Sequence, residues 1–323
     1  MQTVSVIITT HNRPRLLPAA IESAKAAGRN VEVVVVDDAS ADETAAVCRN
    51  ICDIRYVRVE RNQRVAGARN VGLLASRGEY VTFLDDDDVR LPGSLDLQSE
   101  ALASAPEAGL IYARALVADQ GGDLTGDYNP KCSPQGDVFW ELLRRNFIPC
   151  GTALFRRSCL FRVGLLDGSV PGIDDWDLWV RISALHDVVA LEEPVMLWRR
   201  STPVSGQGTS RASEMVARAT RQFRRKWMKL PRAAEATARR RREAWRQFSR
   251  QMAAHLALET ARALKYGHLL RSQKNLAAAL SLHPWGSVRL ATSPAAFRSA
   301  LARAKGKARG EGFDADFTRG RTD

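Results

Sequence analysis

The sequence lacks any long hydrophobic run. Its apolar segments, such as Val33–Val36, have at most the length of a strand and fall far short of the ~20 residues that a membrane-spanning helix needs. Met1 leads directly into a strand pattern, so we expect no signal peptide. The five cysteines are odd in number and lack the paired spacing of metal ligands, which favours core thiols over a metal or redox pair. These absences predict a cytoplasmic protein.

Acidic residues are scarce in the last third of the chain and abundant before it. Residues 1–210 carry 22 Lys and Arg against 28 Asp and Glu, a net charge of −6. Residues 211–323 carry 26 against 8, a net charge of +18. The change lies near residues 201–213, which are rich in Ser, Thr, Gly and Pro and are typical of a loop. The composition therefore predicts three parts: a first domain over 1–210, a basic helical appendage over 211–304, and a disordered tail over 305–323.

The first domain alternates strand and helix patterns. Short runs rich in β-branched residues, bounded by turn residues, are typical of buried strands. Strands are expected at residues 4–10, 31–36, 54–59 and 80–84, and helices at residues 14–27, 42–51 and 65–77. This order predicts an α/β fold with a mostly parallel sheet and helices on both of its faces.

Four consecutive carboxylates, Asp85–Asp88, follow the strand that is expected at residues 80–84. Like charges packed this closely repel one another unless a cation holds them together. Mg²⁺ and Mn²⁺ prefer oxygen ligands, and a diphosphate can complete their coordination. In open α/β sheets, ligands bind outside the carboxyl ends of the strands. The run therefore indicates a metal–diphosphate site, with an acidic, solvated turn as the alternative.

Polar residues follow the other predicted strands as well. Thr9 and His11 come at the end of the first strand, and Asp38 at the end of the second. Arg64 and Arg69 lie after the third strand, and a guanidinium can pair with phosphate through its fork of donors. A carboxylate such as Asp38 can accept hydrogen bonds from a base or a ribose. Since these loops converge at one edge of a parallel sheet, they indicate a nucleotide site.

Five motifs, in this order and spacing, resemble the nucleotide-sugar domain of glycosyltransferase family 2. They are residues 4–13 (VSVIITTHNR), 35–44 (VVDDASADET), 67–72 (GARNVG), 83–88 (FLDDDD) and 174–181 (DDWDLWVR). The resemblance spans about residues 3–200. It implies the GT-A fold, which is Rossmann-like, and an inverting transfer from a nucleotide-diphosphate sugar. A UDP-sugar is the favoured donor, with GDP and dTDP donors as alternatives.

The resemblance also implies roles for the donor-site residues. Thr9 and His11 match positions beside the nucleotide, and Asp38 matches the residue that binds the base. Arg64 matches a position where some members contact the diphosphate. Asp87 and Asp88 match the carboxylates that bind the ribose and a divalent cation, Mn²⁺ or Mg²⁺. Asp85 matches the first acidic position of the longer motif, and Asp86 is an additional carboxylate.

Asp175 matches the catalytic base of the family. Inverting transfer needs one base to take the proton of the acceptor hydroxyl as it attacks the anomeric carbon. A carboxylate with a mildly raised pKa suits that role. Asp174 is a further candidate, and either aspartate can instead cap a helix. Arg199 and Arg200, with residues 205–208, resemble a loop that closes over the donor diphosphate, with a solvated surface as the alternative.

The basic second part is expected to be helical. Trp245, Phe248, Met252 and Leu256 recur at helical spacing and form an apolar stripe beside a row of arginines. This stripe can pack against the rest of the protein, or the helix can dock on the inner face of an anionic membrane. The two interpretations stay open at this stage.

The combined features favour a metal-dependent inverting glycosyltransferase of cell-surface glycan or polysaccharide biosynthesis. Its acceptor is expected to be a glycan, a lipid-linked intermediate or another hydroxyl compound. One alternative is a sugar nucleotidyltransferase, but a glycine-rich phosphate loop after the first strand is replaced here by residues 9–12 (TTHN). The other is a noncatalytic protein that binds nucleotide sugars or nucleic acid, although the basic part has few aromatic residues to stack bases. We expect no specific nucleic-acid partner.

Overall fold

The computed structural model describes residues 3–119, 121–199 and 212–283. The chain divides into two compact units, one of residues 1–210 and 218–244 and the other of residues 211–217 and 245–323. The domain boundaries expected from composition stay a prediction. The predicted tail over 305–323, Arg200 and the loop at residues 205–208 lie outside the described residues.

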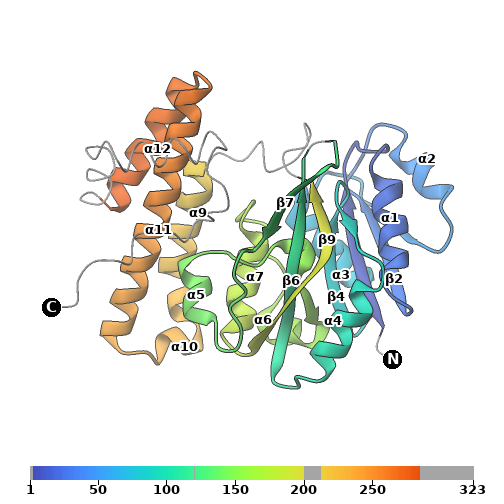
Figure 1. Cartoon of the computed structure of the whole chain (residues 1–323), viewed down its shortest axis with the longest axis horizontal. Helices are drawn as coiled ribbons and strands as arrows, with labels where there is room; N and C mark the ends of the chain where they lie inside the picture. The colour runs from blue at the N-terminus through green and yellow to red at the C-terminus, as the bar shows by residue number, and fades with distance from the viewer. Residues whose placement is uncertain (1–2, 120, 200–211, 284–323) are drawn as a thin grey trace. The chain divides into compact units, whose positions relative to one another are not determined.

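The first unit is built around one nine-stranded sheet with the order β3-β2-β1-β4-β8-β6-β9-β5, and β7 pairs with β6 (Figure 1). The strands are β1 (Val4–Thr10), β2 (Val31–Asp37), β3 (Arg55–Arg58), β4 (Tyr80–Asp85), β5 (Val89–Arg90), β6 (Ala108–Ala118), β7 (Leu124–Asn129), β8 (Leu154–Arg156) and β9 (Asp187–Arg199). The helices of residues 1–199 are α1 (Leu17–Ala26), α2 (Thr44–Arg49), α3 (Arg64–Ala75), α4 (Ser94–Ala103), α5 (Phe139–Arg144), α6 (Leu160–Val163) and α7 (Asp174–Ser183).

Strands β1 to β4 form the parallel part of the sheet, as the sequence predicts. β1 lies between β2 and β4 and is parallel to both, and β3 is parallel to β2. The helix predicted at 14–27 begins at Leu17, with Pro18 in its first turn, so Pro14 precedes the helix. The fold is therefore the expected α/β class.

The rest of the sheet is mixed. β8 is antiparallel to both β4 and β6, whereas β9 is parallel to β6. Figure 1 shows β6 and β9 running side by side along most of their length. β9 also pairs with β5, and β5 follows the acidic run directly. The end of β9 at Arg199 therefore lies beside that run.

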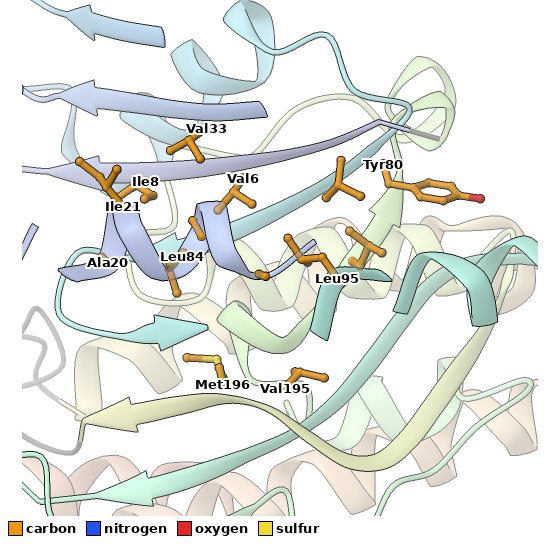
Figure 2. Close-up of a cluster of buried hydrophobic side chains, with 14 of the residues drawn as sticks. Val6, Ile8, Ala20, Ile21, Val33, Tyr80, Leu84, Leu95, Val195 and Met196 are labelled. Carbon is orange, nitrogen blue, oxygen red and sulfur yellow. The ribbon is translucent and has the colours of Figure 1, made fainter. Parts of the chain in front are cut away.

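The main core cluster lies on the α1 face of the sheet. Buried aliphatic side chains of β1 and β2 alternate with residues that face the other side, where α3 packs. Figure 2 shows members of the cluster from β1, β2, β4, α1, α4 and β9, including Ile8, Ile21, Leu84 and Met196. Because the core holds the parallel strands in register, it fixes their carboxyl ends at one edge.

The described part of residues 212–283 is helical. It contains α9 (Ala212–Arg225), the short 3-10 turn Trp227–Lys229, α10 (Pro231–Ala234), α11 (Ala238–Lys265) and α12 (Leu269–Leu282). Within the second unit, Phe248, Met252 and Leu256 are buried. The apolar stripe of α11 is therefore a packing surface. Among the described residues, no helix is long and apolar enough to cross a membrane.

Candidate functional site

The carboxyl ends of β1, β2 and β4 meet at one edge of the sheet. In the strand register, Thr9 is the partner of Asp85, and Thr10 is the partner of Asp37. The loops that follow these strands therefore lie beside one another. This is the convergence that the sequence predicts for a ligand site.

Asp37 and Asp38 have different surroundings although they are adjacent. Both are buried. Asp37 accepts hydrogen bonds from the Ser40 N–H (2.8 Å) and the Tyr56 hydroxyl (2.7 Å), so it holds the turn after β2 together. Burial acts to raise the pKa of Asp37, but these hydrogen bonds outweigh it and hold the pKa below its usual value. Burial raises the pKa of Asp38, against a hydrogen bond from the Gln63 N–H (2.6 Å).

The loop after β1 is tied to the loop after β2. The Nδ1 of His11 lies 2.7 Å from the Asp38 carbonyl oxygen, and the Asn12 N–H donates to the Ser40 hydroxyl (2.9 Å). Asn12 and Ala39 both have positive φ angles, of 55° and 60°, so both turns are tight. These contacts place the His11 ring next to the backbone of Asp38.

Three carboxylates of the acidic run converge. One oxygen from each of Asp85, Asp87 and Asp88 lies within 4.8 Å of the others, and Asp87 and Asp88 are buried. Burial and then the charge of Asp85 raise the pKa of Asp88 well above its usual value. A bound cation would relieve this repulsion, and an all-oxygen donor set suits Mg²⁺ or Mn²⁺. The residues present therefore fit a hard divalent ion.

Asp86 faces a different partner. Its carboxylate lies 2.7 Å from the Arg13 guanidinium, which also lies 3.5 Å from Asp87. Burial raises the pKa of Asp86 to about 6, with the charge of Arg13 acting in the opposite direction. The additional carboxylate of the run thus joins the loop after β1 to the loop after β4.

Arg199, at the end of β9, contacts the acidic run. Its backbone N–H donates to an Asp88 carboxylate oxygen (2.9 Å), and its guanidinium donates to the Asp87 carbonyl oxygen (2.7 Å). In the structure, Arg199 thus braces the carboxylate loop, while its predicted contact with a phosphate stays a prediction. Arg64, the first residue of α3, is exposed near Asp38 and has a φ of 60°.

Arg69 joins the donor edge to α7. Its buried guanidinium donates to Asp85 (2.9 Å) and to Asp174 (3.1 Å), and it lies over the Phe83 ring at 5.2 Å. Asp85 and Asp174 are far apart in the sequence, so Arg69 sets the distance between the acidic run and the start of α7. A contact of Arg69 with the donor, expected from the sequence, stays a prediction.

Asp175 lies beside this network, in the first turn of α7. One carboxylate oxygen accepts a hydrogen bond from the Trp176 N–H (2.7 Å), and the other lies 3.5 Å from the Asn146 side-chain nitrogen. Burial, followed by the charge of Asp174, raises the pKa of Asp175 to about 7, with the charge of Arg69 opposing them. The helix begins at Asp174 after an N-cap at Ile173, so neither aspartate is the N-cap.

A cluster that the sequence did not reveal supports α7 next to Asp175, around the side chain of Asp177. The buried carboxylate of Asp177 accepts hydrogen bonds from the Trp227 indole N–H (2.8 Å), the Arg181 guanidinium (2.8 Å) and Gln222 (3.3 Å). The Trp227 ring also packs on Trp176 at 5.1 Å. Trp227 and Gln222 lie beyond the predicted boundary at residue 210, and their sequence pattern matches ordinary helix packing.

Two neighbouring residues show how tightly the site is packed. A Cβ at Gly151 would lie 2.7 Å from the Met196 sulfur, so the backbone approaches this side chain closely. Trp140 is half-buried, and the Arg240 guanidinium lies 4.8 Å from its ring centre. The structure therefore brings the predicted residues together around two points, the donor edge and Asp175, which Arg69 connects.

Comparisons with known proteins bear on the family and the fold. The family model of glycosyl transferase family 2 matches residues 5–163. The Escherichia coli protein UDP-Glc:alpha-D-GlcNAc-diphosphoundecaprenol beta-1,3-glucosyltransferase WfaP is 29% identical over 187 residues, which cover 56% of this chain and 70% of that protein. The succinoglycan biosynthesis protein ExoO of Rhizobium meliloti is 43% identical over 95 residues, which cover 28% of this chain and 27% of that protein.

Solved structures share the fold. TarS from S. aureus superposes with a TM-score of 0.58 and 17% identity, covering 94% of this chain and 53% of that one. The mannosyltransferase PcManGT from Pyrobaculum calidifontis, solved with GDP-Man and Mn²⁺, gives a TM-score of 0.53 and 20% identity, covering 95% of this chain and 86% of that one.

The fold and the site together define a glycosyltransferase of the GT-A class, with an edge suited to a nucleotide-sugar donor. The chain belongs to glycosyltransferase family 2, and the matched domain forms its N-terminal half. This membership favours glycosyl transfer over the nucleotidyltransferase and noncatalytic alternatives.

Proposed function

We propose that this protein is an inverting glycosyltransferase that moves a sugar from a nucleotide-diphosphate sugar to a hydroxyl acceptor, with a UDP-sugar as the favoured donor. One observation carries the proposal. Asp175, with its pKa raised to about 7, lies in the same network as Arg69, Asp174 and Asp85. A base whose pKa is near 7 is thereby held next to the carboxylates of the donor edge.

The donor nucleotide would lie across the ends of β1 and β2. Asp38 accepts hydrogen bonds from the base, and Thr9 and His11 line the nucleotide. Arg64, exposed at the start of α3, is within the same loop system and can pair with phosphate oxygens. Asp87 contacts the ribose or the metal, as its position in the acidic run suggests.

A divalent cation, Mn²⁺ or Mg²⁺, would be held by Asp87 and Asp88, with Asp85 as a third ligand. The convergence of these carboxylates and the raised pKa of Asp88 support this assignment. Such an ion supplies charge neutralisation to the leaving diphosphate. Arg199 fixes the loop that carries the carboxylates through its bonds to Asp87 and Asp88.

Asp175 removes the proton from the acceptor hydroxyl as that oxygen attacks the anomeric carbon. The nucleoside diphosphate leaves from the opposite face, so the configuration inverts and no covalent enzyme intermediate forms. Asn146 and the Trp176 N–H orient the carboxylate. Because its pKa is near 7, Asp175 is ionised in enough molecules at neutral pH and remains basic enough to accept a proton.

The acceptor is proposed to belong to bacterial-type glycan or polysaccharide biosynthesis. The name of the E. coli relative states a GlcNAc-diphosphoundecaprenol acceptor, and the name of ExoO states succinoglycan biosynthesis. A sugar hydroxyl on a lipid diphosphate is therefore the first acceptor class to test.

The test compares Asp175→Asn with the wild-type protein. UDP release from UDP-glucose and from UDP-N-acetylglucosamine is followed with a synthetic GlcNAc-diphospholipid acceptor, and UDP binding is measured by calorimetry. We expect transfer to fall by about 10²–10⁴-fold while UDP binding is kept, because the base does not touch the nucleotide. Asp53→Asn, at an exposed turn before β3 with a φ of 56°, is the matched control. Normal transfer by Asp175→Asn would show that another group is the base.

A further inference from the structure

The turn between α11 and α12 exposes an unusual group of side chains. Residues 264–270, here called the hairpin tip, are all exposed. Four of them are large and apolar: Leu264 is 44% exposed, Tyr266 65%, Leu269 64% and Leu270 76%. Figure 1 shows α12 turning back beside α11 from this tip. Clustered exposed apolar residues of this kind mark an interaction surface.

The same helices also carry apolar residues that are buried. Phe248, Met252 and Leu256 of α11 and Ala279 of α12 are all buried. The apolar side chains of α11 and α12 therefore include a buried set, and the leucines of the hairpin tip do not belong to it. Their exposure reflects their position at the end of the hairpin, beyond the packed faces of the two helices.

The surroundings of the hairpin tip are basic. Residues 245–283 contain six Lys and Arg and a single acidic residue, Glu259. Glu259 pairs with Arg262 at 2.6 Å and lies 3.9 Å from Arg271. Lys265 lies within the tip and Lys274 follows it on α12, and both are exposed. The surface thus combines protruding aliphatic side chains with an excess of positive charge.

We propose that the hairpin tip docks on an anionic membrane surface. The leucines enter the acyl boundary, while Tyr266 and the lysines lie at the level of the headgroups. Each basic residue near such a surface is attracted by its negative potential.

Charge complementarity selects this occupant. Residues 284–323 carry eight basic and four acidic residues, and a second copy of the hairpin is equally basic, so both would be repelled. A nucleic acid would match the positive charge, but its charged backbone offers no apolar surface that would bury the protruding leucines.

The inference is independent of the proposed donor chemistry. It predicts where the protein binds, whereas the roles of Asp175 and the acidic run predict what it catalyses. If the acceptor is lipid-linked, docking by the hairpin tip would bring the protein to the surface that holds it.

The experiment measures co-sedimentation of the full chain with vesicles of phosphatidylcholine, alone or mixed with anionic phosphatidylglycerol. The wild-type protein is expected to bind the anionic vesicles, with weaker binding at high salt. Leu269→Ser/Leu270→Ser should weaken this binding by roughly a hundredfold, because each leucine that enters the lipid contributes about tenfold. Lys265→Glu/Lys274→Glu should weaken binding to the anionic vesicles and should not change binding to vesicles of phosphatidylcholine. Leu74→Ser, at a leucine of α3 that is 72% exposed, is the matched control and should bind as the wild type does.

Three results would overturn the proposal. The first is no binding of the wild-type protein to anionic vesicles. The second is binding by the double leucine variant as tight as that of the wild type, with matching helical circular dichroism and thermal unfolding showing that both are folded. The third is that the wild-type protein is a dimer in analytical ultracentrifugation and the leucine variant is a monomer, while the two bind vesicles equally well. That result would make the tip a contact between copies. Retention on duplex DNA that is unaffected by the leucine changes, without vesicle binding, would assign the basic charge to nucleic acid instead.

Discussion

The acid limb of the pH–activity profile should move when Asp174 is replaced by asparagine. Asp175 must be ionised to act as a base, and its pKa of about 7 predicts that kcat/KM falls tenfold for each pH unit below that value. Above pH 7 the profile should level off. The rate rises with pH in this range because raising the pH removes the proton from the base.

The structure indicates how large the effect of Asp174 is. Raising the pKa of Asp175 from 3.8 to about 7 corresponds to about 4 kcal/mol between its ionised and protonated forms. Burial is the largest cause, and the charge of Asp174 is the second. Asp174→Asn removes only the second cause and leaves Arg69 paired with Asp85. We therefore expect the limb to move to lower pH by on the order of one unit, with burial still keeping the pKa above its ordinary value.

The assay is a set of initial rates from acidic to mildly alkaline pH at low donor concentration. Asp53→Asn should reproduce the wild-type profile, since its carboxylate lies at an exposed turn before β3. Asp175→Asn should have no limb near neutrality. A limb that stays at the same pH in Asp174→Asn, or a wild-type profile that is flat through neutral pH, would refute the assignment of the limb to Asp175.

Other substitutions test the supporting parts of the fold and site. Gly72→Ala should lower the free energy of unfolding by about 1–3 kcal/mol in urea titrations, because its Cβ would lie 2.3 Å from the Ile7 side chain. Trp227→Phe removes the hydrogen bond to buried Asp177 and should cost about 1–3 kcal/mol, with a lower kcat at nearly unchanged UDP affinity; unchanged kcat would show that this contact does not position α7. Asp88→Ala should weaken UDP binding in the presence of Mn²⁺ far more than in its absence, as measured by calorimetry.

The donor edge could be predicted from the sequence because it depends on local patterns. β1, β2 and β4 are short runs rich in apolar and β-branched residues, and their parallel pairing places Thr9, Asp38 and Asp85 at one edge. The acidic run had the correct position, and the structure added that Asp85 converges with Asp87 and Asp88.

The links between distant segments could not be predicted in this way. Arg69 reaches Asp174 across 105 residues, and Trp227 reaches Asp177 across 50, so no local spacing reveals either contact. Asp86 looked like an additional carboxylate, but its partner Arg13 lies in another loop. The stripe on α11 had two interpretations because periodicity shows that a face is apolar without showing what covers it. Burial of Phe248 decided that question, and the exposed leucines were elsewhere.

The central claim, that this edge of the sheet binds a nucleotide-diphosphate sugar, is tested most directly by calorimetric titration with UDP, with and without Mn²⁺. The wild-type protein is predicted to bind one UDP per chain, and to bind it more tightly when the metal is present. Asp38→Ala is predicted to bind UDP at least tenfold more weakly, because the hydrogen bonds to a buried carboxylate are lost. A tenfold loss of affinity corresponds to about 1.4 kcal/mol. The contrary result is a folded wild-type protein that binds none of UDP, GDP and dTDP with either Mn²⁺ or Mg²⁺.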